Sequence, residues 1–415
     1  MLLMGSQFGK HLSPFSSFTL NSMTRHQPHP NRAHLNFNIR VMRIAIVTEA
    51  FLPQVNGVTN SVLRLLEHCK SQEHEVLIIA PESEGAPSQY LGYKIKHVPS
   101  ISMKKLIPVG VPSKLLEPLL EGFSPDVIHL ASPIFLGHYV TKIAKRIGIP
   151  TVSVYQTDIA GFARHYGLTI AHSSLWRWIS RIHQNSDMTL APSNWSCREL
   201  EANGVKNVRI WKRGVNLENF QPLRRDEILR ADLSHNGAKT IVGYVGRLAN
   251  EKRIDDLAIL DAQSDIQVVI VGIGPAEAKL KKALPNARFV GYQSGAELAR
   301  YVASFDLFVH TGKHETFCQS IQEALASGVP VIGPNSGGPV DLIDHGVTGL
   351  LIDTGNPFEL LSAFDTLRNS PDFSQMSIAA RRAVQHRTWD YINSQLMEHY
   401  LDAIALSEVK KEIAA

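Results

Sequence analysis

Several features that would indicate particular classes of protein are missing from this 415-residue sequence. The chain has only three cysteines, Cys69, Cys197 and Cys318, and no C-x-x-C pair, which disfavours a disulfide framework and favours a reducing compartment such as the cytoplasm. No run of 18 apolar residues occurs, so no membrane-spanning helix is predicted. The net charge of +4 is too small to indicate nucleic-acid binding, although a mildly basic face toward anionic lipid remains open.

Two familiar kinds of ligand motif are missing as well. No D-x-D pair occurs, which removes the usual acidic pair for the metal ion of a sugar nucleotide, so we expect no metal cofactor. No G-x-G-x-x-G follows any predicted strand, which disfavours a dinucleotide-dependent oxidoreductase. His74, His129 and His138 show no metal-ligand spacing and are predicted to be structural.

The first 40 residues contain no acidic side chain. They carry four basic residues, Lys10, Arg25, Arg32 and Arg40, among many Ser, Asn, His and Pro residues. Such a composition cannot bury enough apolar surface to fold by itself. We therefore predict that residues 1–41 are a disordered extension, or follow a start codon placed too early, and that the folded protein begins near Met42; a transit peptide is the alternative.

From Met42 onward, short β-rich runs alternate with helical patterns. The unbroken apolar run at 43–49 predicts a buried strand, and 57–70 has helical spacing. Further strands are predicted at 75–81, 126–131, 151–155, 187–192, 240–246, 267–272, 287–291, 306–310, 329–333 and 348–353, with helices such as 137–147 and 294–304 between them. This alternation is typical of parallel sheets covered on both faces.

The strand and helix pattern restarts after the polar segment 213–225, which predicts a linker. We expect an α/β protein with two doubly wound, Rossmann-like domains, 42–215 and 216–390, facing each other across a cleft. A final helix at 391–415 can cross back to the N-terminal domain. Ligands of such sheets bind outside the carboxyl ends of the strands.

The stretch "HETFCQSIQEALASGVPVIGPNSGGPVDLI" (314–343) contains two glutamates eight residues apart, Glu315 and Glu323. Positions eight apart on one helix point about 80° away from each other, so the pair does not share a helical stripe. Thr316 and Gln319 match a capping box, which predicts that the helix begins after Thr316 and ends before Gly328.

This placement suggests an anion site at the helix N-terminus. The backbone N–H groups near Phe317 and Cys318 are expected to be available for an anion, and the helix dipole favours negative charge there. Glu315 would then need a different partner, such as a sugar hydroxyl or developing positive charge, while Glu323 could accept hydrogen bonds from a vicinal diol. Alternatively, Glu323 is a solvated helix residue and Glu315 only favours the dipole.

Two further segments follow predicted strands. In "GYVGRLANEKRID" (243–255), Arg247 and Lys252 suit a diphosphate, because a guanidinium grips phosphate oxygens bidentately and an ammonium adds a point charge; surface solubility is the alternative. In "EAFLPQVNGVTNSV" (49–62), Gly57 would let a ligand approach the backbone closely, or it simply starts a helix.

One helical segment has a basic and aromatic face. "SLWRWISRI" (174–182) places Trp178 and Arg181 at i, i+3. Such a helix could contact lipid, but we favour packing in the core or against another domain.

Taken together, these motifs resemble a known family. The E-x₇-E segment with "EALASGVPVI", the following "GGPVDLI", the "GR-x₄-K" of 247–252, the "RGVN" linker and the "NGV" loop resemble the retaining glycosyltransferases of the GT-B fold. The resemblance covers about residues 42–400, with the motifs in the family's order. The segments "YQTD" (155–158) and "HLASPIFLG" (129–137) look most like the actinobacterial GDP-mannose-dependent α-mannosyltransferases that glycosylate lipid acceptors.

The resemblance implies roles for the residues named above. Residues 42–215 would bind the acceptor and 216–390 the nucleotide sugar. The diphosphate would be neutralised by Arg247 and Lys252, with the N–H groups of Phe317 and Cys318 on its distal phosphate. Glu315 would lie at the transferred sugar and Glu323 at the ribose, and Gly57 would close over the phosphates.

Some positions depart from the common pattern of the family. Gln156 stands where many members have His, and Asp158 is expected to share that catalytic role. The usual V-G-D/E-G-P reads "VGIGP" at 271–275, and the linker Asp is Asn216.

The expected activity is transfer of a hexose, mannose, from GDP-mannose to a hydroxyl of a lipid or glycolipid at the cytoplasmic membrane face, without a metal cofactor and with no nucleic-acid partner. The alternatives are a UDP-sugar-dependent glucosyl- or sulfoquinovosyl-type transferase, a nucleotide-sugar epimerase of the same fold, and a non-catalytic nucleotide-binding protein.

Overall fold

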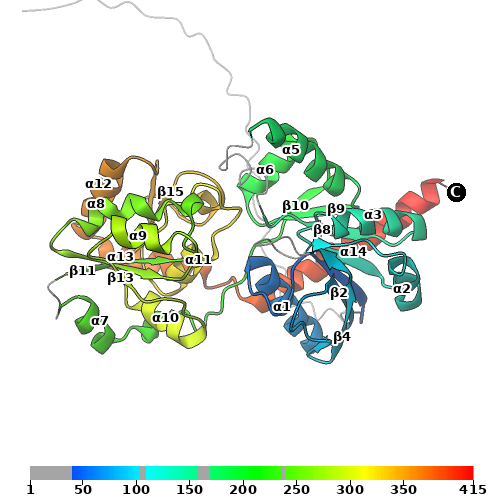
Figure 1. Ribbon diagram of the computed structural model, residues 1–415, viewed down its shortest axis with the longest axis horizontal. Coiled ribbons are helices and arrows are strands. Elements are labelled where there is room, and N and C mark those ends of the chain that lie inside the picture. The colour runs from blue at the N-terminus through cyan, green and yellow to red at the C-terminus, as the bar shows by residue number, and fades with distance from the viewer. Residues whose placement is uncertain (1–39, 102–108, 158–168, 236, 238, 415) are drawn as a thin grey trace, which may run out of the picture. The chain divides into compact units, whose positions relative to one another are not determined.

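Two parallel β-sheets organise the chain, one in each half of the sequence (Figure 1). The computed structural model describes residues 40–101, 109–157, 169–235, 237 and 239–414, and from Val41 onward these form one compact unit. The N-terminal half is defined here as Arg43–Ile210 and the C-terminal half as Glu227–Val384. Residues 1–39, predicted to be an extension, and Asp158 lie outside the described residues.

The sheet of the N-terminal half has eight strands, all parallel except for the last pair. In spatial order they are β10 (Val208–Ile210), β9 (Met188–Ala191), β8 (Thr151–Val154), β7 (Val127–Ala131), β1 (Arg43–Thr48), β2 (Glu75–Pro81), β4 (Tyr93–Val98) and β3 (Gln89–Tyr90). A separate antiparallel pair joins β5 (Ser100–Ile101) to β6 (Val109–Gly110).

The sheet of the C-terminal half has six parallel strands. In spatial order they are β13 (Arg288–Phe289), β12 (Ile266–Val271), β11 (Thr240–Val245), β14 (Leu307–Val309), β15 (Val331–Pro334) and β16 (Gly349–Ile352). Every strand predicted from an apolar run is present, within about two residues at each end, so two parallel sheets are confirmed. Strand β4 and the short strands β3, β5, β6 and β10 were not predicted.

Helices cover both faces of each sheet, as Figure 1 shows. Those of the N-terminal half are α1 (Gly57–Ser71), α2 (Leu116–Phe123), α3 (Leu136–Ile147), α5 (Thr169–Gln184) and α6 (Asn194–Ala202). The later ones are α7 (Glu227–Leu233), α8 (Ala258–Asp261), α9 (Glu277–Ala283), α10 (Gly295–Ala303), α11 (Gln319–Ala326), α12 (Pro357–Arg368), α13 (Phe373–Val384) and α14 (Trp389–Ala414). Single turns of 3₁₀-helix lie at η1 (Pro222–Arg224), η2 (Asn250–Lys252), η3 (Ile254–Leu257) and η4 (Gly338–Asp341).

Strand β1 shows why its apolar run is unbroken. Ile44 and Ile46 pack into the core on one face of the sheet, together with residues of α1 and α14. Ala45 and Val47 point to the opposite face and pack with residues of α2 and α3. Because alternate side chains of a strand face opposite sides, a sheet covered on both faces needs an apolar residue at every position.

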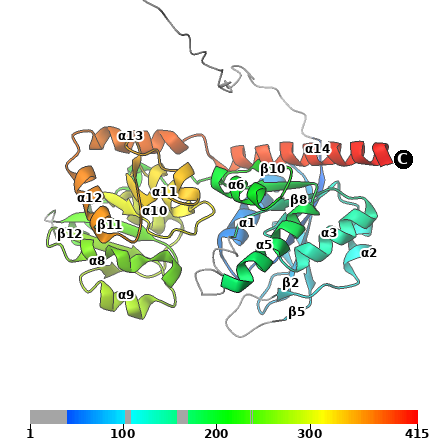
Figure 2. The same cartoon turned by 90° about the horizontal axis from the view of Figure 1, so that it is seen from above.

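The long C-terminal helix α14 packs on the N-terminal half, against α1, β7 and β8 (Figure 2). Trp211 donates its indole N–H to the carbonyl of Ile392 at 3.0 Å. The buried Tyr400 hydroxyl lies 2.8 Å from Nδ1 of His129, which is therefore a structural histidine, as predicted. The segment between α13 and α14 lies beside the linker, because the backbone N–H of Val215 donates to the carbonyl of Arg387.

Direct contacts between the two halves occur at α6. Asp341 of η4 accepts hydrogen bonds from the Asn194 side chain at 3.1 Å and from the backbone N–H of Trp195 at 3.2 Å. A carboxylate beside the first turn of a helix is favoured by the helix dipole. This contact lies next to the segment that carries the E-x₇-E motif, because Ser196 donates its hydroxyl to the carbonyl of Thr316.

Among the helices of the described residues, none is long and apolar enough to cross a membrane.

Candidate functional site

Three loops of the C-terminal half meet at one edge of its sheet. They follow β11, β14 and β15, which are neighbours in the sheet and run parallel, so their carboxyl ends lie side by side. The first loop carries Arg247 and Lys252, the second Glu315, and the third Gly337 and Gly338. The topology therefore gathers three of the sequence motifs where ligands of such sheets bind.

The carboxylate of Glu315 is the centre of this edge. One of its oxygens, Oε1, lies 2.5 Å from the ammonium nitrogen of Lys252 and 3.0 Å from Nε2 of His310. All three side chains are largely buried, with exposed fractions of 17% for Glu315, 20% for Lys252 and 3% for His310. Away from water these charges interact strongly, so Lys252 and His310 fix the position of the carboxylate.

The electrostatics of the cluster follow from this burial. Burial alone would raise the pKa of Glu315, but Lys252 and His310 outweigh it and lower the pKa to about 2. Burial alone would lower the pKa of His310, but the neighbouring Cys318 and Glu315 raise it to about 9. At neutral pH the site therefore holds an ionised glutamate between two cations.

His310 and Tyr244 complete the cluster and were not identified from the sequence. His310 follows β14 directly, and its ring stacks on that of the buried Tyr244, with centroids 5.9 Å apart and planes 10° apart. The sequence offered one indication of His310, which is its position: "DLFVH" ends in a polar residue at the carboxyl end of a predicted strand. Histidines in that position are too common for the sequence to distinguish this one.

Arg247 lies at the rim of the site. Its guanidinium is 54% exposed and pairs with the carboxylate of Glu251, which is only 2% exposed. The arrangement pairs a solvent-facing cation with a buried acid. It differs from Lys252, whose ammonium is committed to Glu315.

The helix that carries Glu323 begins later than predicted. Helix α11 starts at Gln319 with Cys318 as its N-cap residue, and no side chain caps it. The capping box assigned to Thr316 is therefore wrong: the Thr316 hydroxyl donates instead to the backbone carbonyl of Gln156, at 2.9 Å, in the N-terminal half. The predicted end is confirmed, since Gly328 follows the helix with φ +72°.

Cys318 lies in an unusual backbone conformation. Its φ of 80° is in the left-handed region, which residues with a Cβ seldom adopt and which costs about 1–3 kcal/mol. Both Phe317 and Cys318 are buried, with exposed fractions of 5% and 7%. The strained residue turns the chain from the Glu315 loop into α11, so the first N–H groups of the helix follow immediately after it.

The double glycine explains why the motif segment ends as it does. A Cβ on Gly338 would lie 2.4 Å from Cα of Phe317, and one on Gly337 would lie 2.6 Å from the carbonyl oxygen of Glu315. The backbone N–H of Gly338 donates to that same carbonyl at 2.7 Å. The loop after β15 thus packs directly on the backbone of the Glu315 loop and holds it in place.

Glu323 lies on α11 and is half-buried. Burial raises its pKa to about 8, against a smaller lowering effect of a hydrogen bond with the Gln319 side chain. No cation pairs with it among the described residues. Hydrogen-bond donors that contact a carboxyl group with such a raised pKa would stabilise its ionised form.

Gly57 belongs to the other half of the chain. It is the first residue of α1, and the Asn56 side chain caps the helix by accepting from the N–H groups of Val58 and Thr59. A Cβ on Gly57 would meet nothing within 4 Å, so the position faces open space. The structure places it outside the Glu315 cluster, and the predicted catalytic Asp158 lies outside the described residues.

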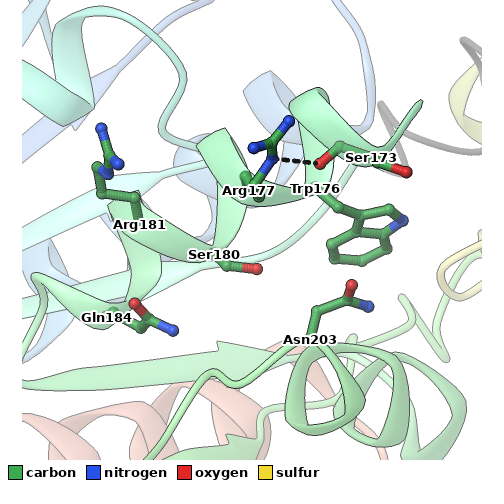
Figure 3. A pocket seen from close by; sticks show the side chains of 7 residues that line it. All are labelled: Ser173, Trp176, Arg177, Ser180, Arg181, Gln184 and Asn203. Carbon is green, nitrogen blue, oxygen red and sulfur yellow. Dashed lines mark hydrogen bonds between the residues drawn. The ribbon is translucent and has the colours of Figure 1, made fainter. Parts of the chain in front are cut away.

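A separate hollow of about 430 Å³ lies on the N-terminal half and contains none of the predicted site residues. Figure 3 shows the residues around it, which come from α5 and from the end of α6: Ser173, Trp176, Arg177, Ser180, Arg181, Gln184 and Asn203. Arg177 and Arg181 are both exposed and lie one turn apart on α5. The hollow therefore has a basic rim.

The Gly338 contact makes a prediction about stability. Gly338→Ala should lower the melting temperature by several degrees, because its methyl group meets backbone atoms that cannot move aside, and overpacking costs about 1–3 kcal/mol. Gly57→Ala is the matched control and should leave the melting temperature equal or higher. Thermal unfolding of the two variants and the wild type measures this, and equal effects would contradict the packing described.

The pKa of His310 predicts a dependence on pH. Since its pKa is about 9 in the folded state and about 6.5 in an unfolded chain, its stabilising effect is complete below pH 6.5 and is lost as the pH rises through 9. The melting temperature of the wild type should therefore fall more steeply than that of His310→Gln between these pH values. Parallel curves for the two proteins would show that the histidine is not charged in the folded state.

The sequence matches known protein families and known proteins. Residues 225–383 match the protein family described as "Glycosyl transferases group 1". Residues 55–219 match the family described as "Glycosyltransferase Family 4". A GDP-mannose-dependent alpha-mannosyltransferase of Corynebacterium glutamicum is 47% identical over 376 residues, covering 89% of this chain and 91% of the relative. A protein of the same description from Mycobacterium tuberculosis is 46% identical over 365 residues, which cover 86% of this chain and 96% of that relative.

Solved structures give the same fold. Sucrose-phosphate synthase from Thermosynechococcus elongatus superimposes with a TM-score of 0.72 at 19% sequence identity, covering 88% of this chain and 99% of that one. At this identity the likeness concerns the fold alone. Together with the relatives above, it shows that the chain belongs to the group 1 glycosyltransferases and is a glycosyltransferase enzyme of the GT-B fold.

Proposed function

We propose that the enzyme transfers mannose from GDP-mannose to a hydroxyl group of a lipid-linked acceptor, with retention of configuration at the sugar. The observation that carries the proposal is the buried Lys252–Glu315–His310 cluster at the carboxyl edge of the C-terminal sheet. The donor assignment is supported by the relatives, whose descriptions name GDP-mannose and which match this chain over most of its length.

Two cations serve the diphosphate in this proposal. The exposed guanidinium of Arg247 reaches the phosphates from the rim, and the ammonium of Lys252 meets them from the buried side. Negative charge grows on the leaving phosphate as the sugar–phosphate bond breaks. Fixed positive groups stabilise that charge more in the transition state than in the bound donor, which lowers the barrier.

The Glu315 carboxylate has the complementary task. The sugar gains positive charge as the leaving group departs, and a carboxylate ionised at every working pH stabilises it. Lys252 meets the donor phosphates while it keeps its ion pair with Glu315, so the carboxylate holds its position beside the sugar. His310 also keeps the carboxylate in place, because its Nε2 contacts the same oxygen.

The remaining site residues bind the nucleotide. The turn at Phe317 and Cys318 presents the N-terminal N–H groups of α11 to the distal phosphate. Glu323, four residues into that helix, accepts hydrogen bonds from the ribose hydroxyls, which favour its ionised form. In this proposal Gly57 approaches the phosphates from the N-terminal half, and Asp158 shares the task of Gln156 at the sugar.

We propose that the reaction requires no metal. His310, Glu315 and Cys318 are the one trio of potential metal ligands found among the described residues, with ligand atoms within 4.8 Å of one another. Lys252 lies 2.5 Å from the Glu315 oxygen that such an ion would need. A fixed ammonium in that position repels a cation and already supplies the positive charge that a metal would bring.

A surface of the N-terminal half suits a lipid-linked acceptor. Phe135 is 50% exposed, and its ring lies 6.2 Å from that of Trp178, which in turn lies 4.5 Å from the ring of His138. Burial lowers the pKa of His138, and the nearby cations of Lys142 and Arg181 lower it further. An exposed aromatic ring beside half-buried rings and basic side chains is typical of a peripheral membrane surface, which we place at the cytoplasmic face.

The donor proposal predicts the effect of removing Lys252. Lys252→Ala should reduce transfer from GDP-mannose about 100- to 1000-fold, which is the usual cost of one preorganised electrostatic donor. Lys313→Ala is the matched control, because it breaks a neighbouring lysine–carboxylate pair (Lys313 with Asp353, 2.7 Å) outside the cluster, and it should retain near-normal activity. Release of GDP in the presence of membrane lipids, with and without a chelator, measures both proteins.

The same proteins should be tested for thermal stabilisation by GDP, UDP, ADP and their sugar conjugates. A nucleotide at 100 times its dissociation constant adds about 2.7 kcal/mol. Stabilisation by guanine nucleotides supports the proposal, and stabilisation by uridine nucleotides alone would replace GDP-mannose with a UDP-sugar. Loss of activity on chelation would contradict metal independence.

The acceptor proposal predicts binding to anionic vesicles. The double variant Arg177→Ala/Arg181→Ala should bind vesicles that contain phosphatidylglycerol about 10- to 30-fold more weakly, since each basic residue near the surface contributes about 1 kcal/mol. Lys279→Ala/Lys281→Ala removes two exposed cations from α9 in the other half and is the matched control. Equal binding by both double variants, or binding of the wild type to pure phosphatidylcholine, would contradict this surface.

A further inference from the structure

The hollow beside α5 is formed by one face of that helix. Its outer side chains recur every three or four residues, as expected for positions that lie one above another on a helix. They belong to Ser173, Arg177, Arg181 and Gln184. Asn203, the residue after α6, lies across from them (Figure 3). Because no residue of the Glu315 cluster lines this hollow, the two sites are separate.

The two arginines of the hollow have no counter-charge. Arg177 donates to the Ser174 hydroxyl at 3.1 Å and to the carbonyl of Ser173 at 3.4 Å, and both of these partners are uncharged. Within the part of the chain that the structure describes, neither Arg177 nor Arg181 pairs with a carboxylate. Like charges one turn apart on a helix repel each other. An anion that accepts from both guanidiniums removes this repulsion and gains charge-assisted hydrogen bonds.

Two amide groups at the edge of the hollow offer hydrogen-bond acceptors. The side chain of Gln184 contacts the carbonyl of Gly204, and that of Asn203 contacts the carbonyl of Glu199, both at 2.8 Å. A carbonyl oxygen only accepts hydrogen bonds, so the amide nitrogens make these contacts and the amide oxygens remain for a ligand. Among the described residues no donor reaches either amide oxygen. Such acceptors suit the hydroxyl groups of a ligand.

The floor of the hollow holds a hydroxyl group without a partner. Ser180 is 6% exposed, and its Oγ has no hydrogen-bond partner in the described part of the chain. A serine inside a helix often donates to the carbonyl four residues back, which Ser180 does not do. Its side chain lines the hollow and points toward Trp176 and Asn203 in Figure 3. Trp176 is fixed in turn by stacking on Tyr155, with ring centroids 6.1 Å apart.

We propose that this hollow binds a phosphate ester of a polyol. The phosphate accepts hydrogen bonds from Arg177 and Arg181, the hydroxyl groups of the polyol donate to the amide oxygens of Gln184 and Asn203, and Ser180 contacts the ester from the floor. Inorganic phosphate would leave the amide oxygens without donors, and a neutral polyol would leave both guanidiniums without a counter-charge. The volume of about 430 Å³ is that of a site for a small molecule.

The place of the hollow indicates a lipid headgroup as the source of this ester. Trp178 precedes Arg181 by three residues on α5, and its ring lies 6.2 Å from that of the exposed Phe135. The hollow therefore adjoins the aromatic surface proposed above to contact the membrane. The headgroup of phosphatidylglycerol joins a phosphate to a glycerol with free hydroxyl groups, which is the combination that the hollow requires. In this respect the inference rests on the proposed function.

The site is tested first with water-soluble probes. Glycerophosphoglycerol and dimethyl phosphate carry the same charge on a phosphodiester, but only the first has hydroxyl groups. Titration of the full chain, followed by the indole N–H resonances of its tryptophans, should show at least about fivefold tighter binding of glycerophosphoglycerol. Gln184→Met keeps the length of the side chain and loses the acceptor, so this preference should vanish. Gln263→Met is the matched control, because the Gln263 amide donates to the carbonyl of Ile259 at 3.1 Å in the other half.

Two further variants separate binding from stability. Ser180→Ala should weaken binding of glycerophosphoglycerol about threefold to tenfold. Its melting temperature should not fall, because the substitution removes a buried hydroxyl group that has no partner. Arg177→Ala/Arg181→Ala should weaken binding of both phosphodiesters at least about tenfold. Lys279→Ala/Lys281→Ala is the control for lost surface charge and should bind both probes as the wild type does.

The source of the ester is tested with short-chain lipids below their micelle concentration. Dihexanoyl phosphatidylglycerol should bind at least about tenfold more tightly than free glycerophosphoglycerol, because its acyl chains reach the aromatic surface. Dihexanoyl phosphatidylmethanol has the same charge without the hydroxyl groups and should bind more weakly. Phe135→Ser should remove the advantage of the lipid and leave the affinity for the free headgroup unchanged, since Phe135 is 50% exposed and does not line the hollow.

Several outcomes would overturn the inference. Equal affinities of the wild type for glycerophosphoglycerol and dimethyl phosphate, an unchanged preference in Gln184→Met, or wild-type affinity in Ser180→Ala would each exclude the polyol site. Equal binding of the lipid and the free headgroup would keep the site and reject its lipid source. If the wild type binds anionic vesicles but neither soluble probe, the membrane surface stands and the hollow fails as a site. If it binds neither vesicles nor probes, both proposals fail together.

Discussion

The ionised carboxylate of Glu315 is the constraint on which the rest of the site depends. A charge placed away from water is costly unless opposite charges and hydrogen bonds surround it. Lys252 and His310 meet this requirement on one oxygen, and they come from the loops after β11 and β14. Both loops must therefore keep their positions relative to each other, which the parallel pairing of their strands ensures.

The loop after β15 adds a second constraint on the Glu315 loop, which comes from close backbone packing. Gly337 and Gly338 bring this loop so close to the backbone of Glu315 and Phe317 that no side chain fits between. The Glu315 loop is thus held by ion pairs on one side and by backbone contact on the other. A rigidly held charge is what electrostatic catalysis requires, since a mobile one would rearrange with the reaction and lose its effect.

The two halves of the chain are joined at this same segment. Thr316 donates to Gln156, Ser196 donates to Thr316, and Arg213 is fixed between α11 and the amide of Gln156. These contacts adjoin Glu315 and link its loop to the N-terminal half through hydrogen bonds.

The sequence by itself determined the sheets and named Lys252 and Glu315 as candidate site residues, but it did not identify His310. Buried parallel strands need apolar residues at every position, so β1, β2 and β12 could be read from unbroken runs, whereas short edge strands such as β3 and β10 carry no such signal. The prediction from the sequence was wrong at the start of α11. The Thr316 hydroxyl donates to the backbone carbonyl of Gln156 in the N-terminal half and does not cap the helix.

Only the tertiary structure decided which of the charged residues meet. The sequence named Lys252 and Glu315 as separate ligand-binding groups, but the fold pairs them and adds His310 between them and Tyr244. It also brings Arg213 to Gln156 across 57 residues of chain. Local sequence sets propensity and periodicity, whereas such pairings depend on which strand ends become neighbours, and that is fixed by the packing of the whole sheet.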